Sequence, residues 1–122
     1  MIIHDGYRDL NLKNPFVTVG VFDGVHLGHR ALLDHLVCRA KKADAESVVI
    51  TFDPHPRLVL SGKSAGLFFL STLDEKKKLL AESGIDHLII LTFTRELAGM
   101  EADDFIRNIL AEKIGARHLL VG

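Results

Sequence analysis

Four short apolar runs recur along this chain, and none of them alternates apolar with polar residues. They are "FVTVGVF" (16–22), "SVVITF" (47–52), "HLIILTF" (87–93) and "HLLV" (118–121). A strand with one face in water shows alternation, whereas a continuous run of this length indicates a strand buried on both faces, as in a parallel sheet. The sequence therefore predicts a parallel sheet built from these four strands.

Helical patterns separate the predicted strands. Apolar residues recur at helical spacing between residues 32 and 40, and the segment 71–84 has capping-box spacing at its start and a glycine at its end. The segment 101–115 also ends at a glycine and places on one predicted face Phe105, Ile106, Ile109, Leu110 and Ile114. Alternating strands and helices predict an α/β domain, a doubly wound parallel sheet of the Rossmann-like type with right-handed crossovers.

Charge and cysteine content narrow the class of protein. Fifteen basic and sixteen acidic residues nearly cancel, so the chain has no overall field that would attract nucleic acid or an anionic membrane. No run approaches the roughly 20 apolar residues of a membrane span, and the start of the chain lacks the basic-then-apolar pattern of a signal peptide. The single cysteine, Cys38, is typical of a reducing compartment. We therefore expect a cytoplasmic protein with no nucleic-acid or membrane partner.

The stretch "VTVGVFDGVHLGHRALL" (17–33) joins the first predicted strand to the helix after it. Glycine inside a regular element costs about 0.5–1 kcal/mol relative to alanine. Gly20 and Gly28 would let a ligand approach the backbone closely, and Gly24 would permit the turn. Ligands of parallel sheets bind beyond the carboxyl ends of the strands, where a helix N-terminus is suited to phosphate. His26 and His29 lie on one stripe of the predicted helix, so both imidazoles would point into that space.

Two other interpretations of these histidines stay open. They could be satisfied polar residues at a helix start, or a metal pair that lacks a third ligand. The three glycines beside them favour a phosphate site.

A second stiff segment follows the second predicted strand. In "TFDPHP" (51–56), Pro54 and Pro56 fix two backbone angles and remove two hydrogen-bond donors. Such a loop would hold His55 and Arg57 at the mouth of the site, or it would be a rigid turn with His55 in solvent. The residue types alone do not decide between the two.

The four residues His26-Leu27-Gly28-His29 resemble the HxGH signature of the nucleotidylyltransferase superfamily. Together with "FDG" at 22–24 and "TFDPHP" at 51–56, they resemble bacterial FAD synthetase, the adenylyltransferase module of bifunctional riboflavin kinase/FAD synthetase. The resemblance covers nearly the whole chain. It implies transfer of the adenylyl group of ATP to FMN, with FAD and pyrophosphate as products and Mg²⁺ bound with the ATP.

The resemblance also implies roles for particular residues. His26 and His29 would be catalytic and contact the ATP phosphates. The nucleotide-binding residues would be Gly20, Phe22, Asp23, Gly24 and Gly28. The flavin or phosphate side would be formed by Pro54, His55, Pro56 and Arg57. No protein side chain is assigned to the metal.

Relatives of this kind continue beyond "LLVG" with a nucleotide loop and a riboflavin kinase domain. On this resemblance, residues 1–122 form a partial nucleotidylyltransferase domain, incomplete at its C-terminus, and the intact protein also phosphorylates riboflavin to FMN. The piece alone would be inactive and prone to self-association. Two alternatives remain: another HxGH transferase that uses ATP or CTP with a different phosphate acceptor, and a non-catalytic nucleotide-binding module.

Several residues with reactive side chains receive no function. The lysines at 76–78 are interpreted as a solvated helix face, and Cys38 as a surface residue. His87 and His118 begin strands, at the end away from the predicted site. His4 has no sequence context that indicates a role.

Overall fold

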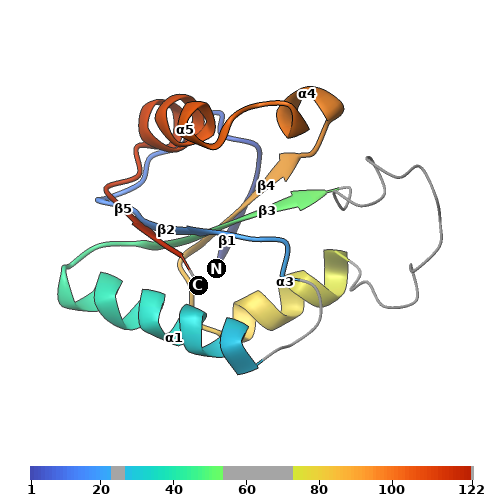
Figure 1. The fold of residues 1–122 in the computed structure, drawn as a ribbon. Helices are drawn as coiled ribbons and strands as arrows, with labels where there is room; N and C mark the ends of the chain where they lie inside the picture. Colours follow the sequence, from blue (N-terminus) through green and yellow to red (C-terminus); the bar gives the residue numbers. More distant parts are fainter. Residues whose placement is uncertain (23–26, 54–72, 122) are drawn as a thin grey trace.

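The computed structural model describes residues 1–22, 27–53 and 73–121, and its centre is a five-stranded sheet (Figure 1). In space the strands run in the order β1-β4-β3-β2-β5, and every neighbouring pair is parallel. The doubly wound α/β class predicted from the apolar runs is confirmed. The strands are β1 (Ile2–Asp5), β2 (Phe16–Val19), β3 (Ser47–Asp53), β4 (His87–Thr92) and β5 (His118–Leu120).

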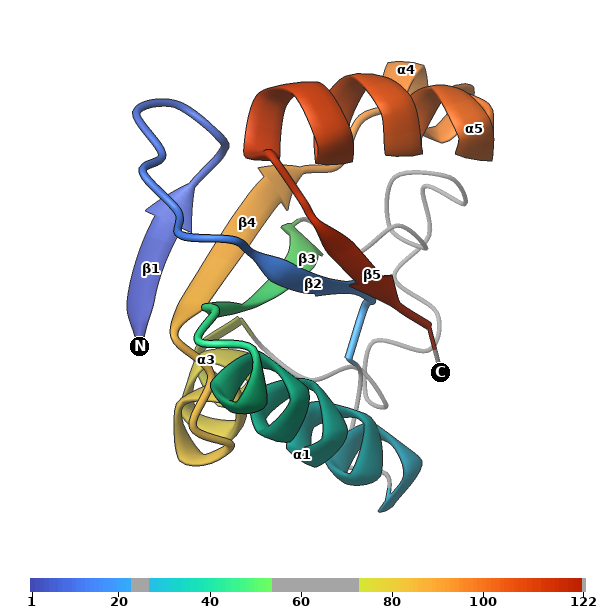
Figure 2. The ribbon, with the colours of Figure 1, turned by 90° about the vertical axis from the view of Figure 1, so that its left-hand side faces the viewer.

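Helices cover both faces of the sheet, as Figure 1 and Figure 2 show from two directions. One layer consists of α1 (Leu27–Lys42) and α3 (Leu73–Glu82). The opposite layer consists of α4 (Arg95–Ala98), α5 (Ala102–Asp104) and the π-helix η2 (Phe105–Ile114). None of the helices in the described part of the chain is long and apolar enough to cross a membrane.

The two helical layers explain why the apolar runs do not alternate. Side chains of one parity, such as Val49 and Leu88, pack in a buried cluster with Leu36 of α1. Their neighbours of the other parity, such as Val48, pack in a second cluster with Leu110 of η2. Each fully buried side chain of this size contributes about 1.5–3 kcal/mol, so both faces of each central strand stabilise the fold.

The order of the strands reverses at β2. The chain continues from β2 to β3 on one side, whereas β5 pairs with β2 on the other side. The buried hydroxyl of Thr18 on β2 donates a hydrogen bond to the carbonyl of Leu120, at 2.8 Å, and so links β2 to β5. In open α/β sheets the ligand site lies beside such a reversal, beyond the carboxyl ends of the strands.

The strand β1 is absent from the sequence prediction, which gave four strands. Its sequence, "IIHD", has only two apolar residues, and both are exposed because β1 is an edge strand beside β4. A short edge strand of this kind has no continuous apolar run to reveal it. The predicted first strand also ends earlier than expected, at Val19 instead of residue 22.

The last helix differs from the prediction in its winding. Residues Phe105–Ile114 form a π-helix, in which hydrogen bonds join residues five apart, and Ile106 is exposed. Its predicted place on the buried face is therefore wrong. The wider winding brings Phe105, Leu110 and Ile114 onto the sheet side and turns Ile106 outward.

Lys76 corrects the interpretation of the lysines at 76–78. Its side chain is only 4% exposed, whereas Lys78 is exposed. Lys76 precedes the buried Leu80 by four residues, so both lie on the same face of α3. Cys38 is exposed, as expected.

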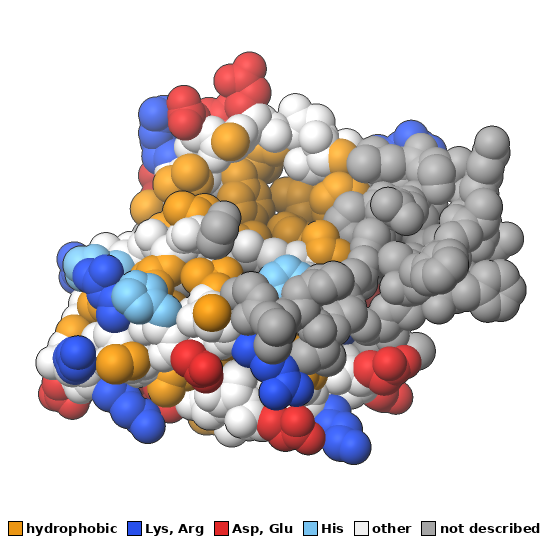
Figure 3. Space-filling model, turned by 60° about the horizontal axis from the view of Figure 1, so that its bottom comes forward, with side chains coloured by type: hydrophobic (Ala, Val, Ile, Leu, Met, Phe, Trp, Pro, Cys, Tyr) orange, Lys and Arg blue, Asp and Glu red, His pale blue; other side chains and the backbone are white. Residues whose placement is uncertain are grey.

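Charged side chains gather on the outer surface of the helical layers. In Figure 3, which brings the α1 and α3 side forward, basic and acidic side chains are interspersed along the lower part of the view, and hydrophobic side chains line a hollow above them. The interspersed signs agree with the near-zero net charge of the sequence.

Candidate active site

The turn that leaves β2 is fastened to the neighbouring strand β3. The backbone N–H of Gly20 donates to the carbonyl of Ile50, at 3.0 Å. The hydroxyl of Thr51, which is fully buried, donates to the carbonyl of Val21 at 3.3 Å. These two hydrogen bonds fix the backbone of the turn before it reaches the helix α1.

Phe22 occupies this turn in an unusual conformation. Its φ of 55° lies in the left-handed region, which costs a non-glycine residue about 1–3 kcal/mol and persists only where the surrounding structure enforces it. The ring is 4% exposed and belongs to the buried cluster under α1. A Cβ on Gly20 would lie 2.8 Å from the ring atom Cε2 of Phe22, so the missing side chain of Gly20 makes room for the ring.

His29 lies in the first turn of α1 and faces Phe22. The two rings meet edge to face, with centroids 5.3 Å apart and an interplanar angle of 63°. The imidazole is half-buried, and its atom Nδ1 is buried. The first turn of α1 holds no acidic residue, so no carboxylate there competes with an anion for the positive end of the helix dipole.

A hollow of about 200 Å³ opens between this turn and α1. It lies at the carboxyl end of β2, where the order of the sheet reverses. The hollow combines the first turn of a helix, an imidazole and the open backbone of Gly20. Phosphate groups bind readily at helix N-termini. Its lining residues are Val19, Gly20, Val21, Phe22, His29 and Leu32.

The structure brings together three of the predicted site residues, Gly20, Phe22 and His29. Gly28 lies in the first turn of α1, next to His29. The other predicted site residues lie outside the described part of the chain, and their roles stay predictions: Asp23, Gly24, His26, Pro54, His55, Pro56 and Arg57. In the part that is described, no three His, Cys, Asp or Glu side chains gather as a metal site.

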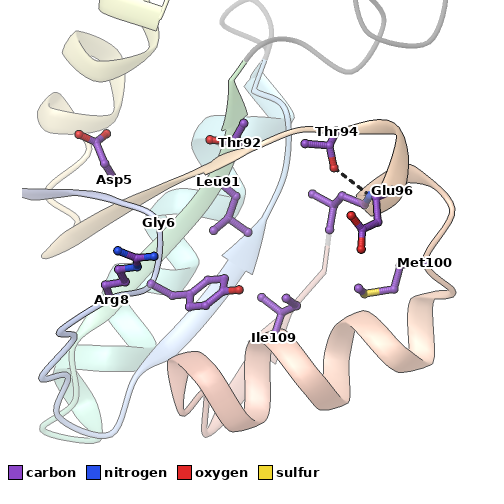
Figure 4. A pocket seen from close by; sticks show the side chains of 11 residues that line it. Asp5, Gly6, Arg8, Leu91, Thr92, Thr94, Glu96, Met100 and Ile109 are labelled. Atoms are coloured by element: carbon purple, nitrogen blue, oxygen red, sulfur yellow. Dashed lines mark hydrogen bonds between the residues drawn. The ribbon is translucent and has the colours of Figure 1, made fainter.

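A larger cleft lies at the same edge of the sheet, at the carboxyl ends of β1 and β4 (Figure 4). Its volume is about 380 Å³. Tyr7 and Arg8, from the segment after β1, form one wall, and Ile109 of η2 forms another. The hydroxyl of Thr94 accepts a hydrogen bond from the backbone N–H of Leu97, at 3.1 Å, and caps α4 beside the cleft. The remaining lining residues are Asp5, Gly6, Leu91, Thr92, Glu96 and Met100.

Comparison with known proteins shows the family of this chain. The model of the family described as FAD synthetase matches residues 9–122. The chain belongs to the FAD synthetase family. A relative from Geobacillus thermodenitrificans (strain NG80-2) is 36% identical over 122 residues, which are 100% of this chain and 65% of that protein.

Two further relatives of this FAD synthetase family member are each described as a bifunctional riboflavin kinase/FMN adenylyltransferase. The protein of Listeria monocytogenes is 31% identical, and the match covers 99% of this chain and 37% of that protein. The protein of Escherichia coli (strain K12) is 38% identical, and the match covers 87% of this chain and 34% of that protein. The chain therefore spans between about a third and two thirds of the length of these curated relatives.

A solved structure shares the fold of this FAD synthetase family member. It is a Streptococcus pneumoniae protein described as a macrolide-efflux protein, with a TM-score of 0.77 and 26% identity, and the match covers 97% of this chain and 46% of that one. The family and the sheet topology thus agree with the two sequence motifs.

Two parts of the site carry no signal in the sequence. In the sequence, Thr51 is a single polar residue in an apolar strand. The pairing of β3 with β2 brings its hydroxyl to the carbonyl of Val21, in the turn after β2. The cleft of Figure 4 depends on β1, which the apolar pattern does not reveal, lying next to β4. Both features come from tertiary neighbours that are far apart in the chain.

Proposed function

We propose that this chain catalyses, as part of an intact protein, the transfer of the adenylyl group of ATP to FMN. A terminal phosphate oxygen of FMN attacks the α-phosphorus of ATP, the bond from that phosphorus to the bridging oxygen breaks, and pyrophosphate leaves. The products are FAD and pyrophosphate. The relatives named as FMN adenylyltransferases support this choice of reaction.

The observation that carries the proposal is the turn from β2 into α1. It puts His29 and a helix N-terminus without acidic residues over a hollow at the reversal point of the sheet. Transfer of this kind forms no covalent enzyme intermediate, so the protein has to hold two anions in line and neutralise the charge on the leaving group. His29 would donate to the phosphates of ATP, and the resemblance gives His26 the same role.

Mg²⁺ would supply further neutralisation of the phosphates. In the described part of the chain, no cluster of three or more His, Cys, Asp or Glu side chains offers a protein cage for it. Mg²⁺ commonly binds through substrate phosphates together with one or two carboxylates. We therefore infer that the ion arrives with ATP.

The cleft of Figure 4 is a suitable place for the ring of the acceptor. It lies at the end of β4, two strands from β2, which corresponds to about 10 Å at the usual spacing of neighbouring strands. The apolar side chains of Leu91, Leu97 and Ile109 with the ring of Tyr7 would contact a flat aromatic group. The ribityl chain of FMN would then extend toward the hollow at β2.

A matrix of substrates tests this function. The intact protein is incubated with ATP or CTP and with FMN or another phosphate monoester, and both pyrophosphate and the coupled product are measured. We expect FAD and pyrophosphate in equal amounts from ATP and FMN. Product from CTP or from another acceptor alone would show a different HxGH transferase, and ATP binding without pyrophosphate would show a non-catalytic module.

The riboflavin kinase activity in the relatives' names stays a prediction for the intact protein, as does self-association of the 122-residue chain.

A further inference from the structure

We propose that Phe22 is a positioning residue that holds the imidazole of His29 toward the hollow at the end of β2. The proposal rests on the proposed function, because the orientation of His29 matters for turnover only if His29 contacts the phosphates. Phe22 acts through His29, because its ring is 4% exposed and packs in the buried cluster under α1. This positioning role differs from the nucleotide-binding role that the resemblance implies for Phe22.

The turn before Phe22 is anchored to the sheet. Hydrogen bonds from Gly20 N–H to the carbonyl of Ile50 and from the Thr51 hydroxyl to the carbonyl of Val21 tie the two residues before Phe22 to β3. Because β3 is a central strand paired on both sides, the start of the turn cannot shift without disturbing the sheet.

The ring of Phe22 fits closely against Gly20. Phe22 has a left-handed backbone conformation, with φ of 55°, and its ring fills the space that the missing side chain of Gly20 leaves open. The φ of Gly20 itself is not positive, so its backbone does not need a glycine. What requires glycine at this position is the ring of Phe22. A strained residue over-determined by its surroundings is typical of a functional site.

The ring of Phe22 also contacts the ring of His29. The rings of Phe22 and His29 are edge to face at 5.3 Å, which is within the favourable range for aromatic pairs. Rotating the imidazole away from the hollow would break this contact. Gly20, Phe22 and His29 therefore form one packed unit that links the backbone of the turn to the ring that faces the ligand.

The chain contains a matched control for this unit. Phe16 is exposed to the same extent as Phe22, 4%, and belongs to the same buried cluster. It also contacts a histidine, His118, with ring centroids 4.2 Å apart. Phe16→Leu should therefore cost a similar amount of packing as Phe22→Leu but leave His29 unchanged.

The test compares Phe22→Leu, Gly20→Ala and Phe16→Leu in the intact protein with isotope-labelled histidine. Nuclear Overhauser contacts from the His29 ring protons to Val19 and Leu32, which line the hollow with it, are measured without substrate, and kcat and KM are then measured for FAD formation. We expect Phe22→Leu and Gly20→Ala to weaken the contacts of the His29 ring with Val19 and Leu32, because the imidazole is no longer held toward the hollow. They should lower kcat by about 10²-fold, as a small misplacement of a catalytic group does, and change the KM for ATP much less. In the Phe22→Leu background, Gly20→Ala should have little further effect.

Phe16→Leu should change the signals of His118 and leave those of His29 and the kcat at the wild-type level. Unchanged contacts of the His29 ring with Val19 and Leu32 in Phe22→Leu would overturn the proposal, as would an equal loss of kcat in Phe16→Leu. A wild-type protein that makes no FAD would contradict the proposed function instead, and the spectra without substrate would still decide whether Phe22 sets the orientation of His29.

Discussion

At the scale of single residues, three side chains that are far apart in the sequence form one hydrogen-bonded chain at the other end of the sheet. His87, which is buried, contacts Glu46 through Nε2 at 2.6 Å and His4 through Nδ1 at 3.0 Å. A carboxylate only accepts hydrogen bonds, so Nε2 of His87 donates to Glu46. Only one proton can lie between Nδ1 of His87 and Nε2 of His4, so one of these two nitrogens donates and the other accepts. His4, which shows no context in the sequence, thus fastens β1 to β4.

This arrangement makes the stability of the fold depend on pH. The pKa of His4 is lowered, first by burial and then by the nearby His87, and the pKa of Glu46 is lowered by its hydrogen bonds from Lys13 and His87. Because the folded pKa of His4 lies below the unfolded value of about 6.5, the unfolded chain binds more protons as the pH falls below that value. Stability is therefore complete above about pH 6.5 and lost as the pH falls through the folded pKa of His4. Glu46 adds a further loss below its unfolded pKa of about 4.5.

Denaturant unfolding between pH 7.5 and 5 measures this effect. His4→Gln, which keeps a hydrogen-bond donor but does not titrate, should show a smaller fall in the free energy of unfolding than the wild type. His35→Gln, at an exposed position of α1, should follow the wild type. Identical pH dependence in His4→Gln and the wild type would show that the His4–His87 contact does not carry the effect.

At the scale of elements, the end of η2 is set by one glycine. Gly115 has φ of 78°, and its N–H donates to the carbonyl of Leu110, five residues earlier. Apart from Gly115 and its two chain neighbours, the described part of the chain places no heavy atom within 4 Å of the position that its Cβ would take. The requirement for glycine is therefore conformational and not steric.

The matched position for a test is Gly99, which follows α4 with φ of −81° and also has ordinary room for a Cβ. Gly115→Ala should lower the free energy of unfolding by about 1–2 kcal/mol, the cost of a left-handed alanine. Gly99→Ala should be neutral or stabilise the fold by about 0.4–1 kcal/mol. Thermal unfolding of the two variants checks this, and equal effects would mean that φ at Gly115 does not limit stability.

The elements also show where sequence patterns stop being informative. Buried strands such as "SVVITF" are visible because both of their faces need apolar residues. The edge strand β1 and the π-winding of η2 depend on contacts with segments that are distant in the sequence, so the local residue pattern does not predict them. Glu101 is the N-cap residue of α5, and its side chain makes no capping hydrogen bond.

At the scale of the whole molecule, the fold class could be predicted, because it follows from the order of strands and helices. The same order predicts the candidate site at the carboxyl end of β2. The reversal of strand order at β2 puts the turn with His29 at the ligand-binding edge. The detailed roles of Phe22, Thr51 and the cleft beside Tyr7 could not be predicted, since each depends on pairs of segments that meet only in the folded sheet.

The central claim is that the turn from β2 into α1 contacts the phosphates during adenylyl transfer to FMN. The most direct measurement is the rate of FAD formation from ATP and FMN by the intact protein and by His26→Ala, His29→Ala and His35→Ala. The account predicts a loss of about 10²–10³-fold for His26→Ala and His29→Ala, the usual cost of one donor to a charged transition state. His35→Ala, on the exposed side of the same helix, should keep the wild-type rate. Small and equal effects of all three substitutions would contradict the account.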